Sequence, residues 1–301
     1  MNTSAQVGFF ENQDDVIRPT WEISAYESLW EKYPSVKKIA ELFQSHNYEL
    51  PSNIAKLVGI VDEKIEQIKN TINGLMPFKS YSAIFHKDFE YPERLRLAEY
   101  PLEVLYYRGA LDLLSSRIVS VVGARQASPE GIKRAKKVAS LLVENKFTVM
   151  SGLAEGIDSA AHQATIENGG KTIAVLGTAL NEVYPKNNKT LQEEIAKEYL
   201  VLSQVPFYVN SLSTFWKYKR NFFPARNVTM AALSAATVIV EASDTSGSLI
   251  QARAAIKQGK KLFILKSCFD KGLNWPETYL KKGAIKITDD KQLVDELQSL
   301  N

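Results

Sequence analysis

The sequence predicts an α/β protein with a Rossmann-like, doubly wound and mostly parallel sheet, preceded by a small all-helical N-terminal domain. From Ile118 onward, short apolar runs without polar alternation are separated by amphipathic stretches, as expected when strands buried on both faces of a parallel sheet alternate with helices. The first two runs end in glycine turns, at Gly123 and at Ser151-Gly152. The predicted strands cover 118–122, 147–150, 172–176, 199–202, 237–240 and 262–265.

The N-terminal part of the chain has a different pattern. Residues 1–25 are polar and irregular, and no structure is expected there. Between 26 and 74, apolar residues recur at helical spacing, with breaks at Pro34 and around Pro51, which predicts three short helices that pack or dock and do no chemistry. Residues 75–301 are expected to form the Rossmann-like domain, with 75–117 as its connecting lead-in and a last helix over 290–300.

Bulk composition limits the class of protein. The 301 residues carry a net charge of +3, which is too small to identify a partner by itself. Cys268 is the single cysteine, so an internal disulfide is excluded. Neither a signal peptide nor an apolar run of membrane-spanning length is present, which favours a cytoplasmic protein without a membrane partner. Because His86 has no histidine or cysteine at ligand spacing, no metal site is expected, and no cofactor is predicted.

The two glycine turns predict an anion-binding edge of the sheet. Gly123 ends the first strand, and Ser128 stands where a helix N-cap belongs, with Pro129 suited to the first helical position. Ser151-Gly152 ends the second strand shortly before a helix that opens near Asp158. Free N–H groups at both helix starts point to the same edge, and Arg125 adds a full positive charge there. We therefore expect phosphate to bind at this edge.

Two later turns belong to the same predicted edge. The third strand ends at Gly177 and is followed by a proline- and asparagine-rich turn with two lysines, Lys186 and Lys189. Ser246, Gly247 and Ser248 open a helix after the strand that ends near Glu241, and small hydroxyl residues with glycine form an anion-binding nest. Ordinary solvated charges explain the lysines equally well, and Ser248 is equally explained as a helix cap.

The segment from Phe207 to Asn227 combines aromatic rings with cations and contains no acidic residue. Its rings include Trp216 and Phe223, and its predicted DNA-binding residues are Lys219, Arg220, Arg226 and Asn227. Bases stack on aromatic faces while lysine and arginine follow the phosphates, so this mixture suits single-stranded nucleic acid. The alternative is a loop whose rings pack over the sheet. Between Arg117 and Lys137, six cations against the single acid Glu130 extend the predicted positive field.

Catalytic motifs are sparse. The chain has neither GxGxxG nor GxxxxGK[ST], so a standard dinucleotide fingerprint or P-loop is not expected. Asp158 and His162 are four residues apart on one helical face, which allows an acid–base pair; the favoured interpretation is that Asp158 orients His162 for structural reasons. We therefore predict no catalytic residue and no enzymatic activity.

Several blocks of the chain resemble the DNA-processing protein A family (DprA, also called Smf). They include VVGARQASPEG at 121–131, SGLAEGIDSAAH at 151–162, FPARN at 223–227 and SGSLIQA at 246–252, and the resemblance covers about 80 to 290. It implies a Rossmann-like domain that binds single-stranded DNA without regard to sequence, protects incoming DNA in natural transformation, and helps to load the recombinase RecA, usually as a homodimer. The family's DNA pocket maps onto Arg125, Ser151-Gly152, Lys189, Arg226-Asn227 and Ser246-Gly247-Ser248.

The chain departs from the family pattern at two of these blocks. Val228 stands where the family usually has the last arginine of FPxRNR, and Gln251 replaces a threonine of SGSLITA. One rival interpretation is a nucleotide-binding or nucleotide-hydrolysing enzyme of the related LOG-type fold, although the PGGxGTxxE block of those enzymes is missing. A second rival is a nucleotide-sensing or interaction module. The prediction retained is a sequence-independent binder of single-stranded DNA.

Overall fold

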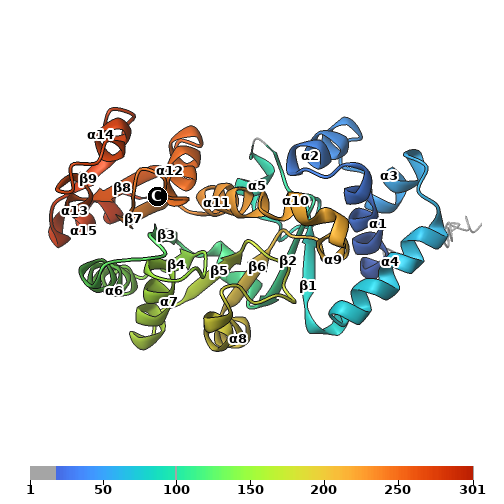
Figure 1. Cartoon of the computed structure of the whole chain (residues 1–301), viewed down its shortest axis with the longest axis horizontal. Helices are drawn as coiled ribbons and strands as arrows, with labels where there is room; N and C mark the ends of the chain where they lie inside the picture. Colours follow the sequence, from blue (N-terminus) through green and yellow to red (C-terminus); the bar gives the residue numbers. More distant parts are fainter. Residues whose placement is uncertain (1–17, 99, 301) are drawn as a thin grey trace, which may run out of the picture.

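The computed structural model describes residues 18–98 and 100–300, and these form one sheet with helices on both faces (Figure 1). The nine strands follow the order β1-β2-β6-β5-β4-β3-β7-β8-β9. From β6 to β9 all neighbours in this order pair in parallel, while β1 and β2 add an antiparallel edge. The strands are β1 Ser82–Phe85, β2 Val104–Gly109, β3 Ile118–Gly123, β4 Thr148–Ser151, β5 Thr172–Leu176, β6 Leu200–Ser203, β7 Ala236–Glu241, β8 Lys261–Leu265 and β9 Ile285–Ile287. The predicted fold class is confirmed.

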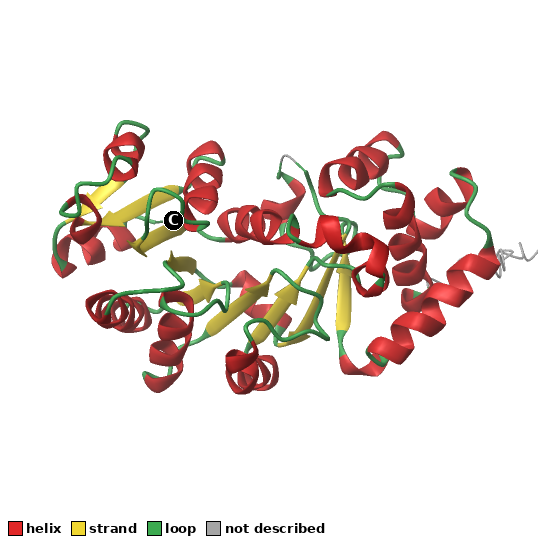
Figure 2. Cartoon of the chain, viewed as in Figure 1, coloured by secondary structure: helices red, strands yellow, loops and turns green. Residues whose placement is uncertain are grey.

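Helices cover the sheet on both sides (Figure 2). Alternate residues of a strand point to opposite faces, and β3 shows this directly: Val119 and Val121 pack with α6 and α7, whereas Ile118 and Val122 belong to the cluster that contains α11 and α12 residues. The helices after β1 are α5 Glu93–Arg96, α6 Pro129–Glu144, α7 Ile157–Glu167, α8 Lys189–Glu198, α9 Phe207–Ser211, α10 Trp216–Lys219, α11 Phe222–Leu233, α12 Ser248–Lys257, α13 Lys266–Phe269, α14 Trp275–Leu280 and α15 Asp290–Gln298.

The N-terminal unit differs from its prediction in two details. It contains four helices, α1 Pro19–Lys32, α2 Val36–Ser45, α3 Pro51–Leu57 and α4 Asp62–Leu75, where three were expected. Helix α1 begins inside the segment predicted to be irregular; residues 1–17 lie outside the described residues. Pro19 stands at the start of α1, where a fixed φ suits the first turn, so the proline marks a helix start that apolar periodicity alone did not reveal.

The lead-in over 75–117 contains the hairpin strands β1 and β2, which the sequence did not predict. Tyr106 of β2 is paired with Ser203 of β6, so this hairpin extends the sheet beyond the parallel strands. Strand β9 was also missed. These strands are three to six residues long, which leaves too few positions for an apolar pattern to stand out.

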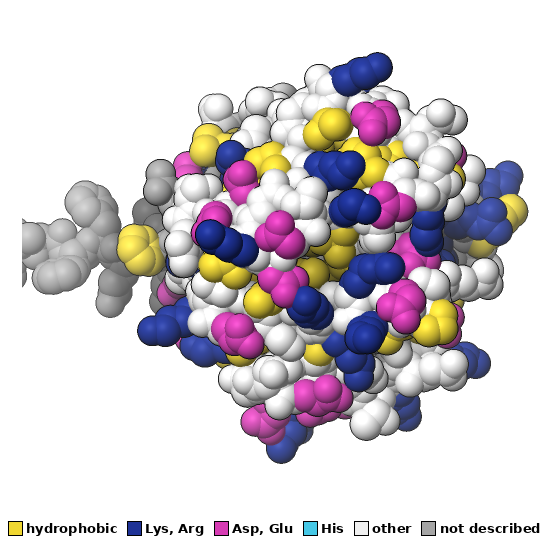
Figure 3. Space-filling model, turned by 90° about the vertical axis from the view of Figure 1, so that its left-hand side faces the viewer, with side chains coloured by type: hydrophobic (Ala, Val, Ile, Leu, Met, Phe, Trp, Pro, Cys, Tyr) yellow, Lys and Arg dark blue, Asp and Glu magenta, His cyan; other side chains and the backbone are white. Residues whose placement is uncertain are grey.

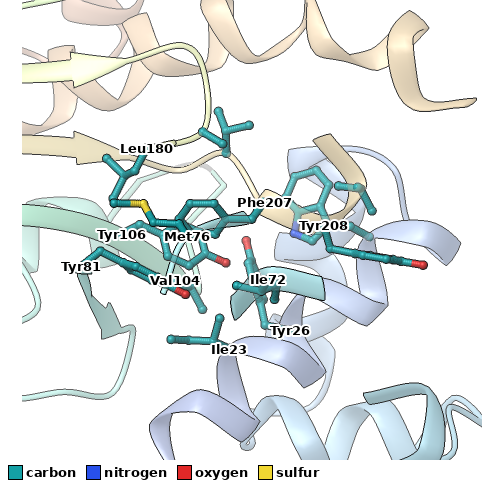
Figure 4. Close-up of a cluster of buried hydrophobic side chains, with 14 of the residues drawn as sticks. Ile23, Tyr26, Ile72, Met76, Tyr81, Val104, Tyr106, Leu180, Phe207 and Tyr208 are labelled. Carbon is teal, nitrogen blue, oxygen red and sulfur yellow. The ribbon is translucent and has the colours of Figure 1, made fainter. Parts of the chain in front are cut away.

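The helical unit shares a core with one face of the sheet. Figure 4 shows Tyr26 and Ile72 from this unit facing Tyr106 and Phe207, and all four are fully buried. A polar contact joins the same elements: the Glu27 carboxylate accepts hydrogen bonds from the Tyr106 hydroxyl at 2.8 Å and from the backbone N–H groups at the start of α9. Within the described residues, no helix combines the length and apolar character needed to cross a membrane.

Candidate nucleic-acid interface

A cleft of about 770 Å³ lies over the carboxyl ends of β3 and β7. These two strands are neighbours, but the chain leaves β3 toward β4, β5 and β6 on one side and returns to β7, β8 and β9 on the other. This switch in strand order is where doubly wound sheets bind their ligands. The cleft is lined by, among others, Gly123, Arg125, Asp158, Phe223, Arg226, Asn227, Glu241, Ser246, Gly247, Ser248 and Lys271.

The structure brings together one part of the predicted site and separates the rest. Residues from three distant blocks of sequence line the cleft: Gly123, Arg125, Arg226, Asn227, Ser246, Gly247 and Ser248. A second group, Ser128, Ser151 and Gly152, makes internal contacts at the turns bordering the cleft. Lys186, Lys189, Lys219 and Arg220 do not line it and lie on the turns and helices near η3 (Lys186–Asn188), α8 and α10.

One wall of the cleft combines a cation, Arg125, with the Phe223 ring, and a second ring, Tyr184, lies beside the cleft. The Arg125 guanidinium lies 5.7 Å from the centre of the Phe223 ring and 5.9 Å from that of Tyr184, and the two rings meet edge to face at 5.6 Å. A Cβ at Gly177 would come within 2.5 Å of the Phe223 ring, so glycine is required beneath it. Tyr184 is half-exposed and was not among the predicted residues. Its place beside Pro185 and Lys186, in a turn already assigned to this edge, was the available signal.

The start of α6 is occupied by an internal carboxylate. Ser128 is the N-cap, as predicted, and its hydroxyl accepts from the Gly131 N–H at 3.0 Å. That hydroxyl donates to Glu241 Oε2 at 2.7 Å, and the Ser128 N–H donates to Oε1 at 3.2 Å. Lys271 completes the arrangement with its Nζ 3.2 Å from Glu241 Oε1. The predicted phosphate contact through Ser128 is therefore corrected, because Glu241 already holds these groups.

Charge at Glu241 is favoured by this setting. Partial burial acts to raise the pKa of the Glu241 carboxyl, but the hydrogen bonds from Ser128 and the nearby Lys271 ammonium outweigh it and hold the pKa below its ordinary value. The group is therefore a full negative charge at neutral pH.

The N–H groups of the turn after β4 are also held by an internal carboxylate, that of Asp158. Asp158 Oδ2 accepts from the N–H groups of Gly152 at 3.2 Å and Ala154 at 3.4 Å. Arg226 donates through Nη1 to the carbonyl oxygens of Gly152 and of Val175, at 2.7 Å for the latter. Burial raises the pKa of Asp158 and lowers that of Arg226, and the attraction between the two opposite charges works against both shifts. Arg226 therefore supports the floor of the cleft and is not a free cation on its surface.

Two further predictions at this turn are corrected. The Ser151 hydroxyl is fully buried and donates to the Val121 carbonyl at 2.6 Å, so it is not available to a ligand. His162 is structural, as expected, but its partner is not Asp158: Nδ1 lies 2.6 Å from the Thr172 hydroxyl. Burial lowers the pKa of His162 to about 3, which keeps the ring neutral.

The start of α12 differs from the other two helix starts. Its first turn has no acidic residue, and the cap residue Gly247 has no side chain to accept a hydrogen bond. The Ser248 N–H donates to the Ser246 hydroxyl at 3.4 Å, and the Leu249 N–H donates to the Ser246 carbonyl at 3.1 Å. The Ser246 and Ser248 hydroxyls lie 2.7 Å apart, and Asn227 donates its side-chain amide to the Gly247 carbonyl at 3.0 Å. Gly247 is exposed, with no atom within 4 Å of a Cβ built there. Of the three helices that open directly after β3, β4 and β7, namely α6, α7 and α12, α12 is the one without a carboxylate at its start.

The aromatic and basic segment divides into core and surface. Phe207, Phe215 and Phe222 are buried in the cluster shared with the helical unit, so the prediction that the rings of this segment stack bases is wrong for them. Trp216 on α10 is 61% exposed and Tyr218 is 39% exposed, with Lys219 and Arg220 next to them in the chain. The surface part therefore keeps rings and cations together outside the cleft.

The basic run on α6 does not extend a uniform positive field. Lys137 is paired with Asp290 and Lys136 with Glu167, and Arg117 donates to carbonyl groups near the end of α15. Figure 3 shows this end of the molecule, where cationic and acidic side chains are interspersed over the surface. The acids come from segments distant in sequence, which is why counting charges within 117–137 overstated the field.

Comparisons with known proteins agree with this geometry. The family model described as DNA recombination-mediator protein A matches residues 82–298. The chain is 40% identical over 196 residues to the DNA processing protein DprA of Streptococcus pneumoniae, a match covering 65% of this chain and 67% of that protein. It is 35% identical over 261 residues to the protein Smf of a Synechocystis species, covering 80% of this chain and 64% of that one. The chain thus spans about two thirds of the length of these relatives.

Solved structures give the same result. The X-ray structure of DNA processing protein A from Streptococcus pneumoniae superposes with a TM-score of 0.70 at 32% identity, covering 90% of this chain and 97% of that one. DNA processing protein A from Helicobacter pylori, whose structure was described for its single-stranded DNA binding mode, gives a TM-score of 0.61 at 28% identity, covering 72% and 95%. The residues matched by the family model, 82–298, include every strand of the sheet. The chain therefore belongs to the DNA recombination-mediator protein A family, known as DprA or Smf.

Proposed function

We propose that this protein binds single-stranded DNA without regard to sequence, through the cleft at the switch between β3 and β7. The observation that carries the proposal is that one cleft contains Arg125, Phe223 and the start of α12, whose first turn has no acidic residue, while the Tyr184 ring packs against Phe223 beside the cleft. The helix start suits one phosphate, and the wall suits the base next to it. The Helicobacter pylori relative, described for single-stranded DNA binding, supports the same ligand.

The phosphate contact falls to the first turn of α12. Ser246 and Ser248 offer hydroxyl groups, Gly247 allows close approach of the backbone, and the Asn227 amide fixes the turn through the Gly247 carbonyl. Arg125 and Lys271 line the same cleft and add positive charge, although Lys271 is shared with Glu241. The proposed backbone path runs between these two cations.

Base contacts are supplied by rings that are exposed or partly exposed. Phe223 and Tyr184 lie in and beside the cleft, and Trp216 and Tyr218 continue the ring surface on α10 with Lys219 and Arg220. Lys186 and Lys189 extend the cationic surface beyond Tyr184. Stacking on an aromatic face does not distinguish one base from another, which is the physical reason to propose sequence-independent binding.

The cellular role follows from family membership. We propose that the protein protects incoming single-stranded DNA during transformation or recombination, helps to load RecA, and acts as a homodimer in the cytoplasm, as a binding protein without catalysis. Recovery of RecA filament formation on DNA precoated with single-strand-binding protein tests the loading step. Light scattering tests the dimer.

Titration of labelled oligothymidylate and of a duplex of equal length, each over a range of salt concentrations, tests the binding itself. The expected result is tighter binding of the single strand, with an affinity that falls steeply as salt rises. Equal affinity for duplex, or binding that salt does not affect, contradicts the proposal. Release of free base from nucleoside monophosphates would instead favour the LOG-type enzyme.

A further inference from the structure

The first helix after the first parallel strand is where doubly wound folds hold the pyrophosphate of a dinucleotide. In this chain that helix is α6, and its start carries Glu241 from the end of β7. The carboxylate accepts hydrogen bonds from the Ser128 N–H at 3.2 Å and from the Ser128 hydroxyl at 2.7 Å, and it forms an ion pair with the Lys271 ammonium at 3.2 Å. These donors are of the kind that a phosphate oxygen would use.

The surroundings fit Glu241 closely. Its side chain is only 10% exposed, and a Cβ at Gly131 would lie 2.3 Å from Oε2, so glycine leaves the room that the carboxylate fills. The backbone holds the residue from the other side: the Ala124 N–H donates to the Glu241 carbonyl at 2.7 Å, and Gly123 is its register partner on β3. Glu241 is therefore fixed at the start of α6 by both its backbone and its side chain.

We propose that Glu241 is a specificity-determining residue that makes the cleft reject pyrophosphate and the nucleotides that carry it. A negative group in this position repels phosphate and already holds the donors of Ser128 and Lys271. Asp158 acts in the same way at the turn after β4, where it holds two N–H groups. Of the helix starts after β3, β4 and β7, only that of α12 then has no carboxylate, and a single phosphate position there suits a polynucleotide with its well-separated phosphates and not two adjacent phosphates.

The second half of this inference rests on the proposed function, because the open position at α12 is assigned to a DNA phosphate. The first half does not: rejection of pyrophosphate by Glu241 is a property of the folded chain that is measurable without DNA. Failure of the oligonucleotide titration and failure of the experiment below are therefore distinguishable.

The test asks whether inorganic pyrophosphate restores stability to a variant that lacks the Glu241 carboxylate, and it is measured by thermal unfolding. Glu241→Ala removes the carboxylate and exposes the donors of Ser128 and Lys271, so the variant melts below the unsubstituted protein. Saturating pyrophosphate is expected to raise the melting temperature of this variant by about 4 °C relative to chloride at equal ionic strength. The unsubstituted protein is expected to show no such rise.

Two controls separate charge from space. Glu241→Gln removes the charge but keeps the site filled, so it is expected to be destabilised without rescue. Glu130→Ala removes an exposed acid from the same first turn and is expected to leave the response to pyrophosphate unchanged. Adding Lys271→Ala to Glu241→Ala is expected to abolish the rescue, because the ammonium is lost.

Two results overturn the proposal. One is a pyrophosphate response of the unsubstituted protein as large as that of Glu241→Ala, which means that Glu241 excludes nothing. The other is a Glu241→Ala variant that pyrophosphate does not stabilise. If that variant does not fold in chloride, the fraction refolded from denaturant in pyrophosphate and in chloride is compared, and equal yields count against the proposal.

Discussion

Arg226 donates through Nη1 to the carbonyl oxygen of Gly152, and the close approach depends on the missing side chain: a Cβ at Gly152 would lie 2.0 Å from that nitrogen. Both residues belong to motifs that the sequence assigns to DNA contact. In the folded chain they hold the turn after β4 against α11, and they position the floor of the cleft.

Gly152→Ala is expected to lower the free energy of unfolding by about 3 kcal/mol, because the buried guanidinium must leave its carbonyl partners. Gly247→Ala is a matched control, since a Cβ there meets no atom within 4 Å and its change is expected to stay within about 0.5 kcal/mol. Urea denaturation measures both. Similar losses for the two variants would show that the contact at Gly152 is not the cause.

Arg125→Ala is expected to flatten the dependence of oligonucleotide affinity on salt, because each phosphate contact on a single strand contributes about 0.7 to the logarithmic slope. Adding Lys189→Ala is expected to flatten it by a similar amount if that lysine follows the strand outside the cleft. Lys261→Ala serves as control. Lys261 begins β8, so it lies at the amino ends of the parallel strands, away from the cleft at their carboxyl ends, and it is paired with Glu296. An unchanged slope in the double variant removes both residues from the interface.

Trp216→Ala is expected to weaken single-stranded DNA binding by about 5- to 150-fold, the range of about 1–3 kcal/mol for loss of one stacked base, with little effect on folding. The comparison is Phe215→Ala. The Phe215 ring is 6% exposed and lies 4.9 Å from the Tyr218 ring, so its loss is expected to destabilise the fold by about 3–5 kcal/mol. Fluorescence anisotropy and thermal unfolding separate the two effects. Binding that survives intact in Trp216→Ala would restrict the interface to the cleft.

Stability is expected to fall as pH rises from about 4.5 to about 7 through Glu27. Burial raises the pKa of this carboxyl to about 7, against the hydrogen bonds from Tyr208, Phe207 and Tyr106 that favour its charged form. The folded state therefore holds the proton over a pH range where the unfolded chain has lost it, so the contribution is full below the ordinary pKa and is lost through the folded one.

Glu27→Gln removes this titration while it keeps a group of similar shape. The difference in unfolding free energy between variant and unsubstituted protein is expected to change by about 3 kcal/mol between pH 4.5 and pH 7.5, in favour of the variant at the higher pH. Urea denaturation across that range measures it. A difference that does not depend on pH would show that Glu27 titrates normally.

The helical unit and the alternating strands were predictable because their information is local. Gly123 and Pro129 act through backbone geometry within a few residues, and an apolar run such as 118–122 reports its own burial. Strands β1, β2 and β9 were missed because their place in the sheet is decided by pairing with distant partners, not by their own short patterns. The N-cap role of Ser128 is local in the same sense and was predicted correctly.

The residues of the cleft were only partly predictable. Arg125 and Ser246-Gly247-Ser248 reach it because they follow the ends of β3 and β7, which the alternation of elements already implies. Asn227 reaches it from α11. Which of the cationic and polar groups remain free was not predictable, because Arg226, Ser128 and Ser151 find their partners on other elements. The aromatic residues of 207–223 illustrate the same limit, since packing against the helical unit buries some of them.

The sequence by itself determined the fold class, the family and the edge of the sheet where the cleft lies, since these depend on periodicity, turn chemistry and motif order along the chain. Only the tertiary structure decided that Glu241 and Asp158 occupy the helix starts at α6 and α7, while the start of α12 has no carboxylate. The reason is physical. A charged side chain has no partner until folding brings one within hydrogen-bond distance. The electrostatic field at the cleft is therefore set by the charges that remain unpaired in the folded chain.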